Sequence, residues 1–125
     1  MTVSVIRSIL AVLAGYAVFA IGALLVFGLS GQKPHADASA GFKTLAIVAG
    51  TAFAIAGGYL AAMIAKSSPV AHSTALGALL ASIAAWSIHA SPVKDPIWSQ
   101  VTAIFFMAPG AILGGVLRSL QRDRD

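Results

Sequence analysis

The sequence predicts an all-α, polytopic membrane protein whose four transmembrane helices form an antiparallel bundle in one domain, residues 1–125. Composition is the first reason: 58% of the residues are hydrophobic, only 10% are charged, and the mean hydropathy is +0.90. A water-soluble domain does not have these values. The second reason is that the chain contains four apolar segments, each long enough to cross a hydrocarbon core of about 30 Å, with short polar segments between them.

The first helix is predicted over residues 3–29. Residues 9–29 carry no charged side chain, and Arg7 lies where its long side chain can reach the membrane interface. Small residues around Asp37 resemble the cleavage site of a signal peptide, but the apolar segment is longer than the ~7 to 15 residues of such peptides. We therefore expect this helix to be retained as a membrane span.

The second helix is predicted over residues 40–65, after a polar loop rich in small residues. It carries a small residue at every fourth position: Ala46, Gly50, Ala54, Gly58 and Ala62. This spacing places the five residues on one face of the helix as a smooth ridge. A neighbouring helix can approach such a ridge closely, which is how helices associate in lipid.

The third helix is predicted over residues 69–90, because Ser68 followed by Pro69 is typical of a helix start. The connection after the second helix is therefore very short and favours a tight antiparallel hairpin. The third helix has a small-residue ridge of its own: Ser73, Gly77, Ala81 and Ala85. We expect the two ridges to face each other, with Gly58 close to Gly77.

The fourth helix is predicted over residues 96–120, because Asp95 and Pro96 repeat the start signal. Trp98, in its first turn, is expected at the membrane interface. Pro109 removes one backbone hydrogen bond near the middle of the helix and predicts a kink there. The glycine pairs at 57–58 and 114–115 leave open an internal repeat of the two hairpins.

The basic residues predict the orientation of the chain. Eight Lys and Arg residues stand against four Asp and Glu residues, and they flank the apolar segments, which favours membrane anchoring over nucleic-acid binding. Five would lie on the face that holds both termini: Arg7, Lys66, Arg118, Arg122 and Arg124. Three would lie on the other face: Lys33, Lys43 and Lys94. This distribution predicts that both termini are cytoplasmic.

The polar residues do not form a recognisable catalytic or metal-binding motif. The chain has no cysteine, and no Asp or Glu lies inside a predicted span, where ion-coupled transport usually places a titratable group. His35, His72 and His89 fall in separate places and do not have ligand spacing. We therefore expect no enzymatic activity, no metal and no cofactor.

One polar cluster is a possible ligand site. His89 and Gln100 lie equally far from the turn between the third and fourth helices, so antiparallel packing would place them at similar depth, near Ser87. These groups would either form a shallow pocket for a ligand or lipid headgroup, or satisfy each other's hydrogen bonds.

One stretch resembles a known group of proteins. The sequence GGYLAAMIA at residues 57–65, followed by PVAH at 69–72 and LG at 76–77, resembles a loose group of uncharacterised four-helix bacterial inner-membrane proteins. The chain departs from their pattern at Met63, where a basic residue would be expected. The resemblance implies a bacterial inner membrane and a four-helix fold, and it implies no activity.

These observations favour a structural or accessory membrane component, which either self-associates or packs beside a larger membrane protein within the lipid bilayer. The reason is that the helices present more small-residue surface than one bundle needs, and we expect the free surface on the first and fourth helices. The alternative is a small oligomeric transporter or channel without a buried coupling carboxylate, in which a kink at Pro109 would be the moving element.

Overall fold

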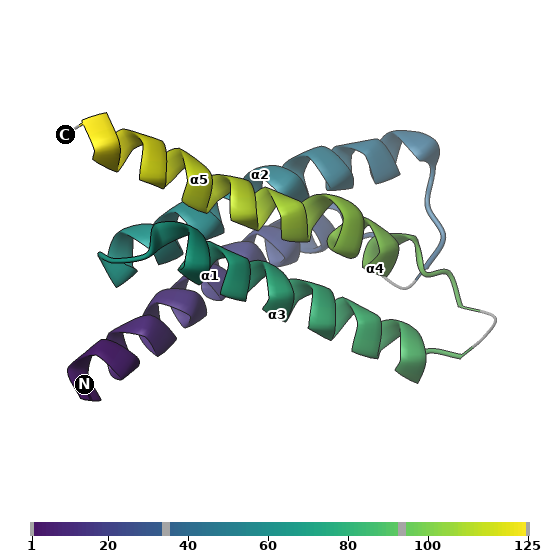
Figure 1. Ribbon diagram of the computed structural model, residues 1–125. Coiled ribbons are helices and arrows are strands. Elements are labelled where there is room, and N and C mark those ends of the chain that lie inside the picture. The colour runs from purple at the N-terminus through teal and green to yellow at the C-terminus, as the bar shows by residue number, and fades with distance from the viewer. Residues whose placement is uncertain (1, 34–35, 93–94, 125) are drawn as a thin grey trace.

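The computed structural model describes residues 2–33, 36–92 and 95–124, and these residues contain helices and connections but no strand, which confirms the all-α prediction (Figure 1). The helices are α1 (Thr2–Ser30), α2 (Ala40–Ala65), α3 (Pro69–Ala90), α4 (Trp98–Thr102), the π-helical segment η1 (Ala103–Met107) and α5 (Ala108–Arg124). The last three follow one another without a break.

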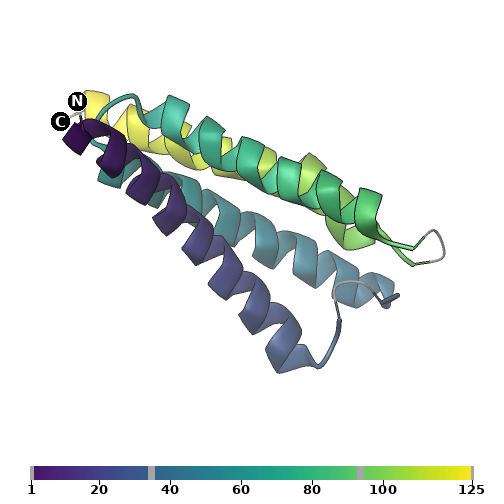
Figure 2. The same ribbon diagram turned by 90° about the horizontal axis from the view of Figure 1, so that it is seen from below.

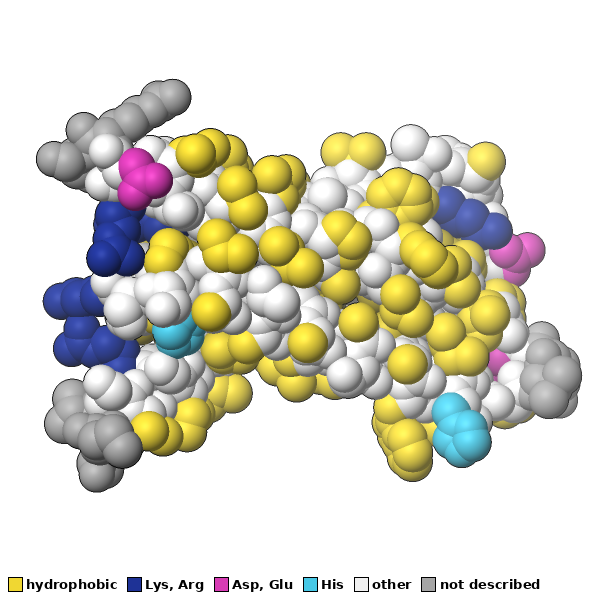
Figure 3. Space-filling view, viewed as in Figure 1, with side chains coloured by type: hydrophobic (Ala, Val, Ile, Leu, Met, Phe, Trp, Pro, Cys, Tyr) yellow, Lys and Arg dark blue, Asp and Glu magenta, His cyan; other side chains and the backbone are white. Residues whose placement is uncertain are grey.

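Four stretches of the described chain are helical, long and apolar enough to cross a membrane: Ser4–Ser30, Ala40–Ala65, Pro69–Ala90 and Trp98–Asp123. This confirms the prediction of four apolar helices. In the space-filling view, the Lys, Arg, Asp and Glu side chains gather at the two ends of the molecule and leave an uncharged middle (Figure 3). Length, apolar composition and charge placement therefore fit a multi-pass membrane protein.

Both termini lie at the same end of the molecule, together with the short connection between α2 and α3 (Figure 2). We call this the terminal end. The opposite end, the loop end, holds the α1–α2 loop and the connection from α3 to α4. Toward the loop end α1 diverges from α3, whereas α3 and α5 stay close together along their length (Figure 2).

Helices α2 and α3 have the bounds expected from the sequence, but the cap of α3 differs from the expectation. Ser39 accepts a hydrogen bond from the backbone N–H of Phe42 (3.1 Å) and caps α2. Ser68 precedes α3 in a left-handed conformation (φ 46°), and its side chain does not cap the helix. Lys66 is also left-handed (φ 64°), so the two residues reverse the chain between α2 and α3.

The fourth apolar helix begins later than expected. The sequence predicted a start at Pro96, whereas α4 begins at Trp98 with Ile97 as its N-cap residue. Asp95, Pro96 and Ile97 are not helical, and the N–H of Asp95 donates to the carbonyl oxygen of Pro92 (3.0 Å).

The irregular segment of the last helix lies just before Pro109. Within η1 the hydrogen bonds widen to five residues, and the N–H of Ala108 donates to the carbonyl oxygen of Ala103. A proline ring clashes with the carbonyl group four residues earlier in an α-helix, which here belongs to Phe105. A π-helical turn changes the position of that carbonyl, so the proline is accommodated by a local widening of the helix.

Helix α5 packs between the two small-residue ridges. A Cβ atom on Gly58 would overlap the carbonyl oxygen of Ala111 in α5, and a Cβ on Gly77 would lie 2.8 Å from the carbonyl oxygen of Ala108. The expectation that the two ridges face each other is therefore wrong. Both glycines allow the backbone of α5 to approach closely. Helix α5 has glycines of its own at 110, 114 and 115, which also favour close packing.

The ridge residues are mostly inside the bundle. Seven of the nine are buried: Ala46, Gly50, Ala54, Gly58, Ala62, Ser73 and Gly77. Ala81 is half-buried, and Ala85 is exposed. The hydroxyl group of Ser73 donates to the carbonyl oxygens of Val70 (3.0 Å) and Ile112 (3.4 Å), so this residue also connects α3 to α5. The small residues thus hold the bundle together.

Candidate functional site

A cavity of about 250 Å³ lies between the helices in the half of the molecule nearest the loop end. Most of its wall is apolar and comes from all four apolar helices: Tyr16, Phe19, Ala23, Val26, Phe27, Ala46, Gly50, Leu80, Ile83, Ala84, Ala103 and Met107. The remaining lining residues are Ser87, Trp98, Ser99, Gln100 and Thr102.

Gln100 supplies the polar corner of this cavity. Its side chain is buried, with 4% of the residue exposed, and its Nε2 donates a hydrogen bond to the hydroxyl oxygen of Ser87 on α3 (3.2 Å). The hydroxyl group of Ser99 donates to Gln100 Oε1 (3.0 Å). The amide of Gln100 and the hydroxyl group of Ser87 therefore join α4 to the end of α3.

His89 does not join Gln100, so the structure does not bring the expected pair of site residues together. His89 is exposed, and its ring lies 5.7 Å from the ring of Trp86, which is 69% exposed. The reason is helical geometry: His89 follows Ser87 by two residues, which turns it about 200° around the helix axis and onto the opposite face. The sequence placed His89 at the right depth but on the wrong face.

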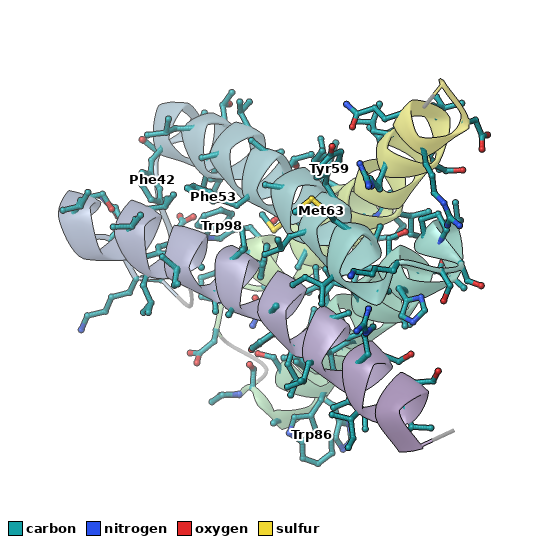
Figure 4. The ribbon with its side chains drawn as sticks, turned by 90° about the vertical axis from the view of Figure 1, so that its left-hand side faces the viewer. Phe42, Phe53, Tyr59, Met63, Trp86 and Trp98 are labelled. Carbon is teal, nitrogen blue, oxygen red and sulfur yellow. The ribbon has the colours of Figure 1, made fainter. Side chains whose placement is uncertain are left out.

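Three aromatic rings close the loop end next to the cavity. Phe27 at the end of α1, Phe42 at the start of α2 and Trp98 at the start of α4 lie with ring centroids 5.8 to 6.2 Å apart. The indole Nε1 of Trp98 donates to the carbonyl oxygen of Ala36 in the α1–α2 loop (2.9 Å). Trp98 lies among the helices, whereas Trp86 points away from them (Figure 4).

An ion pair lies beside this aromatic cluster. The Nζ of Lys43 lies 3.0 Å from a carboxylate oxygen of Asp37 and 5.8 Å from the centre of the Trp98 ring. The hydrogen bond from Lys43 holds the pKa of Asp37 below its ordinary value, and the N–H of Ala38 adds to this effect. These contacts tie the α1–α2 loop to the cluster.

The terminal end has a different polar contact. His72 is near Ser8 of α1, with 2.8 Å between Nε2 and the hydroxyl oxygen, and its Nδ1 lies 2.9 Å from the carbonyl oxygen of Ser68. It therefore joins α1 to the start of α3, a role that its place in the sequence did not indicate. His35 lies outside the described residues. Among those described, no group of three His, Cys, Asp or Glu side chains could hold a metal ion.

The cavity suits an uncharged apolar group that has one hydrogen-bonding end. No Lys, Arg, Asp or Glu is among its lining residues, and its polar corner consists of amide and hydroxyl groups. Comparison of the chain with protein-family models, with curated proteins and with solved structures gave no match. Function is therefore inferred from the geometry of the molecule itself.

Proposed function

We propose that this chain is a multi-pass protein of the bacterial inner membrane, with four antiparallel spans and both termini in the cytoplasm. We propose further that it is a structural or accessory component, associated with a second copy or with a larger membrane protein. Four long apolar helices with their charges at the two ends support the first part. The excess of basic residues at the terminal end supports the orientation.

The outward face of α3 is the observation that carries the proposal of association. Five exposed residues follow one another at intervals of four and three positions: Ala71, Ala75, Ala78, Ser82 and Ala85. Residues spaced alternately four and three positions apart lie along one line on the helix surface, here called the seam. Two helices that cross at about 20° contact each other along such a seam. Small side chains on a lipid-exposed seam let another helix approach closely, and Ser82 adds a group able to form a hydrogen bond.

The outward face of α1 differs from that of α3. It carries large aliphatic side chains, each more than half exposed: Ile6, Leu10, Leu13, Ile21 and Leu24. Large aliphatic side chains are typical of a surface in contact with lipid chains, whereas a row of alanines is typical of a helix–helix contact. The glycines of α5, at 110, 114 and 115, are buried in the bundle, so we propose α3 as the associating helix, and no longer the first and fourth helices.

Native mass spectrometry in a mild detergent tests this proposal. We expect the wild-type protein to be released as a dimer or with a membrane partner, and we expect Ala78→Phe to shift it to monomer because the larger ring separates the helices. Leu24→Phe, on the outward face of α1, is the matched control and should keep the wild-type mass. A wild-type protein that is strictly monomeric and without partners contradicts the proposal.

A small oligomeric transporter or channel is the second candidate, and the cavity beside η1 favours it. Ala103 and Met107, the first and last residues of the π-helical segment, line that cavity, and Pro109 follows two residues after Met107. π-helical turns inside α-helices are frequent at functional sites. This candidate predicts solute flux in proteoliposomes that falls when Pro109 is replaced by alanine. Equal flux from wild type and Pro109→Ala would leave the π-helical turn without a role in transport.

A further inference from the structure

Two pockets flank the end of α2 at the terminal end of the molecule. The first, about 310 Å³, lies between α2, α3 and α5 and is lined by Ala62, Met63, Lys66, Pro69, Arg118 and Arg122. The second, about 440 Å³, lies between α1 and α2 and is lined by Ile6, Arg7, Leu10, Ile64 and Lys66. Lys66 is common to both, so the two pockets are adjacent.

The polar lining of both pockets is cationic. Arg118 and Arg122 belong to the first pocket, Arg7 to the second and Lys66 to both. Within the described part of the chain, none of these four side chains forms an ion pair, since the one ion pair there joins Lys43 to Asp37 at the other end. Dark blue side chains accordingly gather at the terminal end in the space-filling view (Figure 3). The pockets are therefore complementary to anionic groups.

Arg118 makes a contact that restricts its side chain before any ligand binds. Its guanidinium carbon lies 6.0 Å from the centre of the Tyr59 ring, a cation–π contact, and the hydroxyl group of Tyr59 donates to Gln121 Oε1. Tyr59 precedes Met63 by four residues on α2 (Figure 4), and Met63 lines the first pocket. The guanidinium group therefore loses less freedom on binding an anion than a free side chain would.

The start of α3 adds to the positive potential of the first pocket. Pro69, the first residue of this 22-residue helix, lines the pocket. The N-terminus of a helix carries a partial positive charge and favours anions. Each pocket also has apolar walls beside its cations: Ala62 and Met63 in the first, and Ile6, Leu10 and Ile64 in the second. Each pocket thus offers cations for a phosphate group next to apolar surface for an acyl chain.

We infer that the terminal end binds a phospholipid with two phosphate groups, one in each pocket, across Lys66 at the end of α2. The acyl chains run along the apolar walls on the two sides of α2. Basic pockets between membrane helices on the cytoplasmic side are suited to headgroups with more than one phosphate. This inference rests on the proposed membrane location and orientation, and it is independent of association through α3.

Native mass spectrometry of the full-length protein in mild detergent, titrated with defined lipids, tests this inference. The lipids are cardiolipin, phosphatidylglycerol at twice the molar concentration so that total phosphate is equal, and neutral phosphatidylcholine. We expect retention in the order cardiolipin, then phosphatidylglycerol, then phosphatidylcholine. Arg7→Gln and Arg118→Gln, one in each pocket, should each weaken cardiolipin binding about fivefold. Lys33→Gln, at the loop end, is the control and should bind like wild type.

The role of Tyr59 gives a second, more specific test. Tyr59→Leu removes the ring under Arg118 and should weaken cardiolipin binding about as much as Arg118→Gln, whereas Tyr59→Phe keeps the ring and should retain most of the binding. Circular dichroism checks that each variant is folded. Weaker cardiolipin binding by a folded Tyr59→Leu variant then shows that binding depends on the position of Arg118.

Three results would overturn the inference. The first is equal retention of cardiolipin and phosphatidylglycerol at equal phosphate. The second is wild-type binding by both Arg7→Gln and Arg118→Gln. The third is displacement of cardiolipin by inorganic pyrophosphate at equal phosphate, which would indicate a site for a soluble phosphate. The same spectra report the mass of the protein assembly, so a failure of lipid binding is distinguished from a failure of association.

Discussion

Replacing Gly58 with alanine is the most direct test of the packing between α2 and α5. The added Cβ would overlap the carbonyl oxygen of Ala111. Because that oxygen belongs to the backbone, rotation of a side chain cannot remove the overlap, and α5 as a whole must move away from α2. Overpacking of this kind costs about 1 to 3 kcal/mol.

Gly28→Ala is the matched control for this substitution. Gly28 is also helical, but nothing lies within 4 Å of the position that its Cβ would take. Both substitutions replace a helical glycine by alanine, which gains at most about 1 kcal/mol of helix propensity. The difference in unfolding free energy between the two variants therefore isolates the packing cost, and we expect Gly58→Ala to be less stable by about 1 to 3 kcal/mol.

Unfolding from mild detergent by added sodium dodecyl sulfate, followed by circular dichroism, measures this difference. Two variants of equal stability would refute the close packing of α2 against α5. If Gly58→Ala were the more stable of the two, the helix interface would have to lie elsewhere.

Two further predictions concern the two ends of the molecule. The lowered pKa of Asp37 means that its ion pair with Lys43 stabilises the folded chain at pH values above 3.8, the ordinary pKa of this carboxyl group, and that the contribution is lost as the pH falls from there through the lowered pKa. The stability difference between wild type and Asp37→Asn should therefore vanish in acid. A difference that persists there would contradict the ion pair. His72→Ala should lower the unfolding free energy by about 1 kcal/mol, because the contact with Ser8 is lost; the same unfolding assay measures it, and unchanged stability in His72→Ala would count against that contact.

Much of the fold follows from local sequence signals. Hydropathy located the four apolar helices, and Pro69 marks the start of α3 where the structure has it. The same kind of signal at Asp95 and Pro96 did not mark a helix start, because the helix begins only at Trp98. A proline two residues before a helix looks the same in sequence as a proline in its first turn.

The partner of each small-residue ridge could not be predicted from sequence. A ridge such as the one through Gly58 shows that a close neighbour is possible, but α1, α3 and α5 all carry glycines, and only the three-dimensional arrangement selects α5. The π-helical turn before Pro109 was missed for a similar reason, since the sequence shows that a proline disturbs the helix but not which backbone hydrogen bonds widen. The kink itself stays a prediction.

The candidate site was predicted in part. Gln100 and Ser87 were expected to lie near each other, and they are joined by a hydrogen bond beside the cavity. The inward position of Trp98 was not foreseen, because interfacial preference alone does not show that an indole has Phe27 and Phe42 to pack against. The expectation for His89 was wrong because counting residues from the turn gives the position along the helix, but not the face of the helix on which a residue lies.

Cysteine crosslinking in native membranes tests the central proposal, association through the outward face of α3, most directly. The chain has no cysteine, so each single substitution introduces a unique thiol. We predict that Ala78→Cys forms a crosslinked dimer, or a crosslink to a membrane partner, whereas Leu24→Cys on the outward face of α1 stays monomeric. Crosslinking at Leu24→Cys with none at Ala78→Cys would contradict the proposal.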